Sequence, residues 1–321
     1  MILPPFEYHR PGSVEEALKI AADCSGDFDY VAGGSDLLQN YKNRLNPRGN
    51  LISLTGIKEM HGATEERIGG LTLLADLERD GSVHPALRTA ASLVASPLVR
   101  QQATVAGNLL VETRCFYFNQ TEFWRRSLGY CMKAEGDVCL VVPQKERCYA
   151  TYSGDLAPVF MVLDATYHLA GPGGRREVKA RDFYSGDGIE RNVKKPEEIL
   201  THVTLPGSSR SLQADYSKLR VRDTFDYPMM SVAASLRLDG DEVEEFHVVV
   251  NAVDTRPLPF EDYTASLRGR RFDEKFTEEV SSEVRDRSCP VKNLVLSTAY
   301  RKKMIGVYLA RILKGFLETA A

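Results

Sequence analysis

The sequence lacks long apolar runs, an excess of basic residues and a recognisable leader, and each absence excludes a class of protein. No segment approaches the roughly 18 consecutive apolar residues of a membrane-spanning helix. Residues 1–8 contain no basic region followed by an apolar core, so we expect no secretory signal. The net charge of -3 argues against a general nucleic-acid binder. We therefore expect a cytoplasmic protein whose partners include neither nucleic acid nor a membrane.

Two common ligand-binding motifs are also missing. The fingerprint G-x-G-x-x-G does not occur in the sequence, which excludes a Rossmann NAD site. The closely spaced C-x₂₋₄-C pairs from which structural zinc sites are usually built do not occur either. The chain has no internal repeats and no low-complexity tract. Any cofactor site therefore has to be sought in other residues.

What is present indicates an ordinary soluble protein of more than one unit. The chain has 321 residues, of which 43% are hydrophobic and 26% are charged, and this length predicts two or three packed units. A small α/β unit is predicted to close near residue 56, and the small polar stretch 207–211 is the predicted linker. We therefore expect three parts, at residues 1–56, 57–208 and 209–321.

Apolar periodicity and turn residues predict a mixture of helices and strands. Ser13 and Glu16 form a capping box, in which the Ser13 hydroxyl accepts from the residue 16 amide and the Glu16 carboxylate can reach the Ser13 amide. Helices are predicted at residues 14–21, 76–80, 84–93, 273–286 and 297–317. Strands are predicted at 29–32, 51–54, 68–73, 198–205, 214–222, 230–238 and 244–250, with a hairpin at 167–178. The last helix has one apolar face. We expect this face to dock on the last sheet rather than to lie on a membrane surface.

Two glycine-containing turns are suited to an anionic ligand. They are Ala32-Gly33-Gly34-Ser35-Asp36 and Thr104-Val105-Ala106-Gly107-Asn108. Glycines let a diphosphate approach the backbone closely, and successive amides can form a nest for anionic oxygens. Ser35 adds a hydroxyl, and we expect the second turn to offer a second set of the same groups. The alternative for each turn is a tight strand–helix connection without a ligand. One turn alone favours this alternative, whereas two such turns in one chain make ligand binding equally well supported.

Four of the six cysteines lie within 34 residues, at intervals of 16, 8 and 9, and they are Cys115, Cys131, Cys139 and Cys148. In the cytoplasm such clusters are more often metal ligands or redox groups than disulfides. Thiolates spread along a loop suit a cuboidal iron–sulfur cluster, whose irons lie apart, better than they suit zinc. Unligated buried thiols remain a third interpretation. Cys24 and Cys289 are predicted to be small buried hydrophobic residues.

The cysteine stretch is weakly basic and rich in aromatic residues. From Arg114 to Cys148, six basic and four acidic residues give a local charge of +2. This charge would partly offset a thiolate-ligated cluster and could attract an acidic electron donor. The aromatic residues are expected either to keep a cluster dry or simply to pack the loop, and they are Phe116, Tyr117, Phe118, Phe123, Trp124 and Tyr130.

In the order of its motifs the chain resembles the FAD-binding medium subunit of the xanthine oxidase family of molybdenum hydroxylases. The resemblance covers essentially the whole chain and is carried by residues 13–18, 32–38, 68–72, 104–108, 164–165, 199–206, 225–228 and the C-terminal helix. Ala106 stands where the family commonly has glycine, which weakens its amide as a contact for the diphosphate. Ser35 stands where the family often has threonine, which preserves the hydroxyl.

The resemblance implies an α+β chain in which two α/β subdomains, residues 1–56 and 57–208, clasp FAD and are followed by a smaller C-terminal α+β domain, residues 209–321. No residue is expected to be catalytic. Asp155 has a surface helix cap as its alternative role. Carried over by position, the residues expected to bind FAD are Ala32, Gly33, Gly34, Ser35 and Asp36 along the diphosphate, Thr104, Gly107 and Asn108 on its other side, and Asp155, Leu156, Leu200 and Lys218 toward the isoalloxazine.

The insert at residues 113–150 resembles that of the 4-hydroxybenzoyl-CoA reductase branch of the family, which implies a [4Fe-4S] cluster on Cys115, Cys131, Cys139 and Cys148. The implied function is to relay electrons from ferredoxin through the cluster and FAD to a small subunit with two [2Fe-2S] clusters. A large molybdenum-cofactor subunit would then dehydroxylate 4-hydroxybenzoyl-CoA to benzoyl-CoA, within a dimer of heterotrimers. One alternative is the FAD subunit of a related hydroxylase that oxidises an aldehyde or an N-heterocycle. The other is a zinc-stapled scaffold without redox function.

Overall fold

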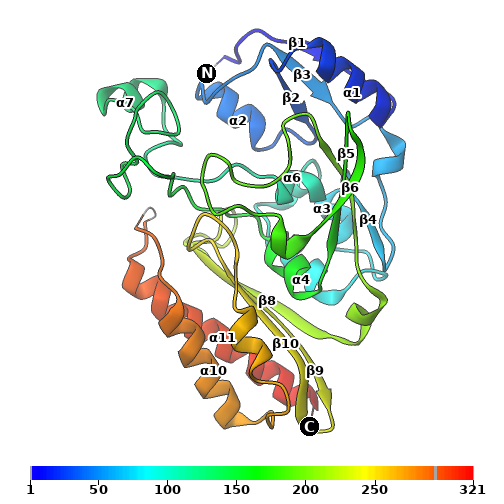
Figure 1. The fold of residues 1–321 in the computed structure, drawn as a ribbon, viewed down its shortest axis with the longest axis vertical. Helices are drawn as coiled ribbons and strands as arrows, with labels where there is room; N and C mark the ends of the chain where they lie inside the picture. The colour runs from blue at the N-terminus through cyan, green and yellow to red at the C-terminus, as the bar shows by residue number, and fades with distance from the viewer. Residues whose placement is uncertain (1, 293–294, 321) are drawn as a thin grey trace.

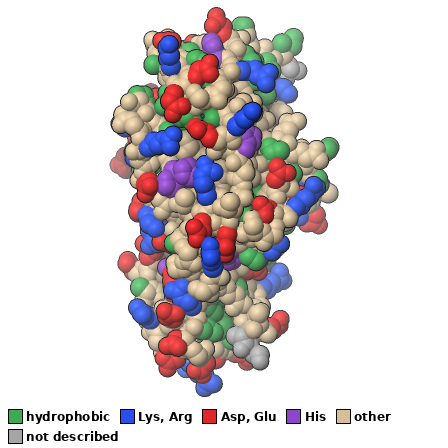
Figure 2. Space-filling view, turned by 90° about the vertical axis from the view of Figure 1, so that its right-hand side faces the viewer, with side chains coloured by type: hydrophobic (Ala, Val, Ile, Leu, Met, Phe, Trp, Pro, Cys, Tyr) green, Lys and Arg blue, Asp and Glu red, His purple; other side chains and the backbone are tan. Residues whose placement is uncertain are grey.

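The computed structural model describes residues 2–292 and 295–320. Three small sheets follow one another along the long axis of the molecule, with the N-terminal sheet at the top of Figure 1 and the C-terminal sheet beside two long helices at the bottom. Figure 2 shows acidic and basic side chains interspersed over one face. In this part of the chain, none of the helices combines the length and the apolar character of a bilayer-spanning segment.

The first sheet is parallel in the order β1-β3-β2, and its strands are β1 (Glu7–His9), β2 (Phe28–Val31) and β3 (Asn50–Ser53). Helix α1 (Val14–Asp23) begins after Ser13, whose Oγ accepts from the Glu16 amide at 3.1 Å as predicted. The Glu16 carboxylate accepts from the Gly12 amide at 2.7 Å, one residue before the predicted partner. Helix α2 (Leu37–Lys42) follows the first glycine turn directly.

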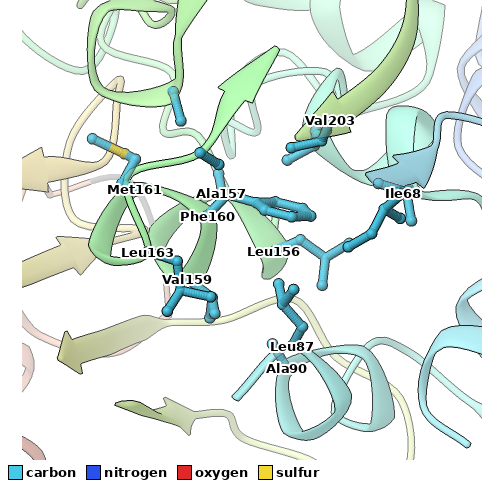
Figure 3. Packing of buried hydrophobic residues seen from close by; sticks show 14 of the residues in the cluster. Ile68, Leu87, Ala90, Leu156, Ala157, Val159, Phe160, Met161, Leu163 and Val203 are labelled. Atoms are coloured by element: carbon cyan, nitrogen blue, oxygen red, sulfur yellow. The ribbon is translucent and has the colours of Figure 1, made fainter. Parts of the chain in front are cut away.

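The second sheet is antiparallel in the order β4-β7-β5-β6, and its strands are β4 (Arg67–Gly69), β5 (Thr166–Gly171), β6 (Gly174–Lys179) and β7 (Ile199–Thr204). The helices around it are η1 (Lys58–Met60), α3 (Leu74–Leu77), α4 (Pro85–Ser92), α5 (Pro97–Arg100), α6 (Val105–Leu109), α8 (Leu156–Val162) and η2 (Ala180–Asp182). Every residue of α8 is buried. Figure 3 shows this helix at the centre of the largest core, between Ile68 and Val203 of the sheet and Leu87 of α4.

The third sheet is antiparallel in the order β11-β10-β9-β8, and its strands are β8 (Gln213–Leu219), β9 (Met230–Asp239), β10 (Glu242–Asn251) and β11 (Leu258–Pro259). The helices of this part are η3 (Gly207–Ser211), α9 (Glu261–Ala265), α10 (Glu274–Arg287) and α11 (Thr298–Ala320). Helix α11 packs on β9 and β8 and against α10, so the predicted docking of the last helix is confirmed. The core of this part contains one fully buried cation, Arg301 of α11.

The cysteine stretch leaves the body of the protein and returns to it at one point. Arg114 and Thr151 exchange two backbone hydrogen bonds of 2.7 and 2.8 Å. Between them the chain extends away from the sheets and contains α7 (Glu122–Ser127), visible apart from the body in Figure 1. The guanidinium of Arg125 donates to the carbonyl oxygens of Asn43 and Arg44 at 3.0 and 2.9 Å, which ties the stretch to the end of α2.

Most long elements agree with the sequence predictions, as do the short strands β2 and β3, whereas several other short elements were not predicted. The mixed α+β fold with a separate C-terminal sheet and helices is confirmed, as are the hairpin and the two last helices. The predicted strand at 68–73 stops at Gly69, because the chain turns toward α3. The predicted linker 207–211 forms the single turn η3. Strands β1 and β11 and helices α5, α6, α7, α8 and α9 were not predicted, since segments of two to seven residues carry too little periodicity.

Candidate functional site

A cavity of about 1020 Å³ lies between the first two sheets and the start of the third. It is lined by both glycine turns, by the loop 189–194 and by residues 225–227 of the C-terminal part. Ten of the twelve residues predicted to bind a cofactor line this cavity. The two exceptions are Leu156, which is fully buried in the core of α8, and Lys218, which lies behind Asp155. A cavity of this size is large enough for an extended ligand of dinucleotide size.

The first glycine turn presents unpaired backbone donors to the cavity. Within residues 2–292 and 295–320, the amides of Gly33, Gly34, Ser35 and Asp36 donate to no acceptor. Gly34 has a φ of +66°, a conformation that favours glycine. Gly33 lies so close to the segment just before the second turn that an added Cβ would lie 1.8 Å from the carbonyl oxygen of Gln102. Amides without an intramolecular acceptor are what an anion nest requires, and binding of an anion by this turn stays a prediction.

The second glycine turn differs from the prediction, because its amides are already used within the protein. The amides of Gly107 and Asn108 donate to the side chain and carbonyl of Thr104 at 3.1 and 2.9 Å. The amide of Ala106 donates to the carbonyl oxygen of Gly70 at 2.8 Å. The expectation of a second set of free amides is therefore wrong. This turn lines the cavity as a wall that is held in place by its own hydrogen bonds.

Asp36 joins three separate parts of the chain at the cavity. Its Oδ1 accepts from Arg114 Nη1 at 2.8 Å and from the Tyr227 hydroxyl at 2.9 Å. The Arg114 guanidinium also lies 4.5 Å from the centroid of the Tyr227 ring. The carboxylate therefore links the first turn, the start of the cysteine stretch and the C-terminal part. With these partners it is engaged as a structural link, in addition to lining the cavity.

Asp155 is buried at the cavity wall rather than capping a helix on the surface. It is 2% exposed, and its Oδ1 accepts from Lys218 Nζ at 2.9 Å and from the Tyr216 hydroxyl at 2.7 Å. Burial raises the pKa of Asp155 above its ordinary value, and the Lys218 ammonium opposes this shift. The alternative of a surface cap is therefore wrong. Lys218 contacts this carboxylate and does not itself line the cavity.

Sequence reasoning missed the basic side of the cavity, which is formed by Arg48, Arg191, Lys194 and Arg222. Lys194 Nζ donates to three backbone carbonyls, those of residues 195, 196 and 198, at 2.8 to 3.3 Å. Burial, followed by the charge of Arg191, lowers the pKa of Lys194 to about 8. These residues belong to loops without a motif. The one signal in the sequence is the basic cluster of Arg191, Lys194 and Lys195 just before the predicted strand at 198–205, and Arg48 and Arg222 have no such signal.

The four clustered cysteines are all buried, although the segment that carries them extends from the body. Cys115, Cys131 and Cys148 share one small core, and Cys139 is 3% exposed and close enough for its charge to act on Cys115 and Cys148. Burial raises the pKa of Cys115 to about 11 and that of Cys148 to about 12. Backbone amides of residues 117 and 150 donate to the sulfurs of Cys115 and Cys148, each at 3.4 Å.

The four sulfurs do not converge as the ligands of a single ion do. In the described part of the chain, no three His, Cys, Asp or Glu side chains form a group that could hold one metal ion. A knuckle-type zinc site is therefore not supported by this arrangement. Buried thiols that share a core and accept from backbone amides fit the donor set of a polynuclear cluster, whose irons lie apart.

Cys24 and Cys289 correct one prediction, and the aromatic residues divide between the two roles expected of them. Cys289 is exposed and Cys24 is only half-buried, so neither is a fully buried hydrophobic residue. Phe118 packs among the clustered cysteines, whereas Phe123 is 82% exposed. Phe116 is 55% exposed and contacts the Trp124 ring at a centroid distance of 6.1 Å. Tyr117 and Phe118 therefore lie against the cysteine core, and the exposed rings do not cover it.

Comparisons with known proteins cover nearly the whole chain. Residues 4–208 match the family described as FAD binding domain in molybdopterin dehydrogenase, and residues 214–316 match the CO dehydrogenase flavoprotein C-terminal domain. The chain is 32% identical, over 82% of its length and 86% of the relative, to the FAD-binding subunit of aldehyde oxidoreductase from Escherichia coli.

Carbon monoxide dehydrogenase of Hydrogenophaga pseudoflava is a second relative. Its medium chain is 25% identical over 98% of this chain and 97% of its own length. In a solved structure of that enzyme, a chain that is 26% identical superposes with a TM-score of 0.78, covering 98% of both chains. Sequence and structure therefore agree over both matched domains.

Proposed function

Since this chain belongs to the FAD-binding medium subunits of the xanthine oxidase and CO dehydrogenase family of molybdenum hydroxylases, we propose that it carries electrons within a larger oxidoreductase. Its FAD-binding domain provides the cavity, and bound FAD supplies both one- and two-electron transfer. In the complex we propose, the partners are a large molybdenum-cofactor subunit and a small subunit with two [2Fe-2S] clusters. Two such heterotrimers would form the enzyme.

The observation that carries this proposal is the row of free amides at residues 33–36 in a cavity of about 1020 Å³. These amides bind the FAD diphosphate as backbone donors, and Gly33 lets the two turns meet. Leu200 and the Asp155–Lys218 pair form the wall proposed to lie nearest the isoalloxazine. Asp36 holds the surrounding segments together through Arg114 and Tyr227. The boundaries 1–56, 57–208 and 209–321 remain our proposal for its subdomains.

We propose aldehyde oxidation as the reaction of the complex, because the aldehyde oxidoreductase relative shares 32% identity over most of this chain. Two electrons leave the aldehyde, which gains an oxygen from water to become a carboxylic acid, and two protons are released. The second candidate is reductive dehydroxylation of 4-hydroxybenzoyl-CoA with electrons from ferredoxin, which the cysteine stretch favours.

The substrate is tested on the complex purified with its partner chains. We expect the complex to catalyse reduction of a one-electron dye by aromatic or aliphatic aldehydes. This rate should be at least ten times the rate at which the complex converts 4-hydroxybenzoyl-CoA with a reduced viologen as electron donor. Benzoyl-CoA formation without aldehyde oxidation would replace the first candidate by the second. Absence of flavin from the purified complex would contradict the electron-transfer function itself.

We further propose that the stretch at residues 113–150 holds a [4Fe-4S] cluster on Cys115, Cys131, Cys139 and Cys148. The support is chemical: four buried thiols in one segment, amides directed at two of the sulfurs and a local charge of +2. Low-potential clusters are tuned by such hydrogen bonds and by burial. In this role the stretch exchanges electrons between the flavin and a one-electron carrier such as ferredoxin.

Replacing Cys131 by serine is expected to abolish the cluster signal and to leave FAD bound. The reason is that Cys131 belongs to the cysteine core and does not line the FAD cavity. Iron content, an anoxic visible spectrum and flavin content measure the two effects separately. Cys289→Ser, at an exposed position elsewhere, is the matched control and should change neither. Loss of iron and FAD together from a correctly folded Cys131→Ser protein would argue that the two sites are not separate.

A further inference from the structure

Lys133 is a buried lysine two residues beyond Cys131. Its side chain is 5% exposed, and Nζ lies 2.7 Å from Glu112 Oε1 and 2.7 Å from the carbonyl oxygen of Gly188. The carbonyl and hydroxyl oxygens of Thr113 also accept from it. A lysine is rarely buried unless a counter-ion and hydrogen bonds compensate its charge, so Glu112 defines the place of this ammonium group.

The group of Lys133, Glu112 and Arg191 carries a net positive charge, because Glu112 is shared by two cations. Its second carboxylate oxygen accepts from Arg191 Nη1 at 2.8 Å. Burial would raise the pKa of Glu112, but Lys133 and Arg191 together hold it below its ordinary value. The carboxylate is therefore ionised at neutral pH. Lys133, Arg191 and Glu112 together carry one net positive charge.

This charge stands in the wall between the FAD cavity and the four cysteines. Lys133, Glu112 and Phe118 line the cavity. On the other side, Phe118 packs in the cysteine core, and its ring centroid lies 4.9 Å from Lys133 Nζ. Gly188, whose carbonyl accepts from Lys133, lies so close to Cys148 that an added Cβ would be 2.7 Å from the sulfur. The same short wall therefore faces both sites.

We propose that the Lys133 ammonium, fixed in the wall between the FAD cavity and the four cysteines, raises the reduction potential of the iron–sulfur cluster. This inference rests on the function proposed above. A thiolate-ligated cluster is anionic, and its reduction adds one more negative charge. In surroundings of low dielectric, a nearby positive charge stabilises the reduced form more than the oxidised form. Lys133 thereby favours the presence of the electron on the cluster side of the wall.

The test is a redox titration of the purified complex, followed by electron paramagnetic resonance of the cluster. Lys133→Met is expected to lower the ratio of reduced to oxidised cluster at least tenfold at a fixed potential, which is 59 mV for a one-electron couple. Lys133→Arg keeps the charge and is expected to stay within a threefold ratio of the wild type. The double variant Lys133→Met with Glu112→Gln removes both charges of the pair, and it should recover at least half of the shift.

Lys145→Met is the matched surface control, because this lysine lies in the same stretch with an exposed side chain. It removes the same charge from a solvated position and should leave the ratio unchanged, since water screens exposed charges. Flavin content and thermal unfolding of each variant show whether the wall has kept its structure.

The outcomes separate this inference from the function on which it rests. A wild-type complex that shows the signals of the small subunit's [2Fe-2S] clusters but no [4Fe-4S] signal overturns both the inference and the proposed cluster. A wild-type cluster whose potential is unchanged in Lys133→Met overturns the inference alone. If Lys133→Met assembles no [4Fe-4S] cluster, retention of the [4Fe-4S] signal by Lys133→Arg still supports a requirement for the charge, whereas its loss from both variants shows a packing role and overturns the inference.

Discussion

Replacing Gly33 by alanine is expected to yield a folded protein that no longer retains FAD. A Cβ at this position would lie 1.8 Å from the Gln102 carbonyl oxygen and 2.5 Å from its carbon, both of them backbone atoms that cannot rotate away. The first turn and the segment at Gln102, which leads into the second turn, would have to separate, and this moves the free amides of residues 33–36 relative to the opposite wall. We expect FAD affinity to fall about a hundredfold, or about 2.8 kcal/mol, near the upper end of the ~1–3 kcal/mol range of overpacking.

Flavin content after purification and a fluorescence titration with FAD measure this effect. Gly81→Ala is the control, because a Cβ there meets no atom within 4 Å. Circular dichroism verifies that Gly33→Ala is folded. Wild-type FAD affinity in a folded Gly33→Ala protein would show that contact between the two turns is not needed for binding.

Replacing Arg301 by methionine is expected to destabilise the C-terminal domain by about 3 kcal/mol. The guanidinium is fully buried and donates to the carbonyl oxygens of Met229, Val291 and Ala252 at 2.7, 2.7 and 2.6 Å. Burial lowers its pKa to about 10, so the arginine is still charged at neutral pH. Methionine fills the volume but leaves three carbonyls without a donor, and the relief of burying a charge offsets only part of this cost.

Urea unfolding, followed by far-ultraviolet circular dichroism, measures the difference in free energy. Lys303→Met, at an exposed position of the same helix, is the control and should change the stability by less than about 0.5 kcal/mol. Arg301→Lys keeps the charge with a shorter reach and is expected to fall between the two. Equal stability of Arg301→Met and Lys303→Met would mean that the buried hydrogen bonds contribute nothing net.

The parts of the site that sequence reasoning predicted are those that depend on neighbours in the chain. The turn at residues 33–36 could be predicted because glycine, hydroxyl and helix start are consecutive. The cysteines could be grouped because they share one short stretch. The N-cap of α1 could be predicted because Ser13 and Glu16 are three residues apart. The Glu16 carboxylate, however, accepts from the Gly12 amide instead of the Ser13 amide.

The parts that it could not predict depend on residues far apart in sequence. Asp36 contacts Arg114 and Tyr227, which are 78 and 191 residues away. Whether the amides of the second turn are free or hydrogen-bonded depends on the carbonyl oxygens of Gly70 and Thr72. Only the folded structure brings these residues close to the turn. The burial of Arg301 requires three carbonyls from separate segments. Tertiary contacts of this kind have no local pattern.

The cysteine stretch is closed at its ends but is also anchored along its length. Arg114 and Thr151 are bonded to each other, and within the stretch Arg125 donates to the carbonyl oxygens at the end of α2 while Lys133 pairs with Glu112. Loop entropy alone therefore understates the cost of removing the stretch, because Lys133 also lines the cavity. Protein engineers who shorten this segment would have to rebuild part of the cavity wall, so a graft of another redox centre should keep both anchors.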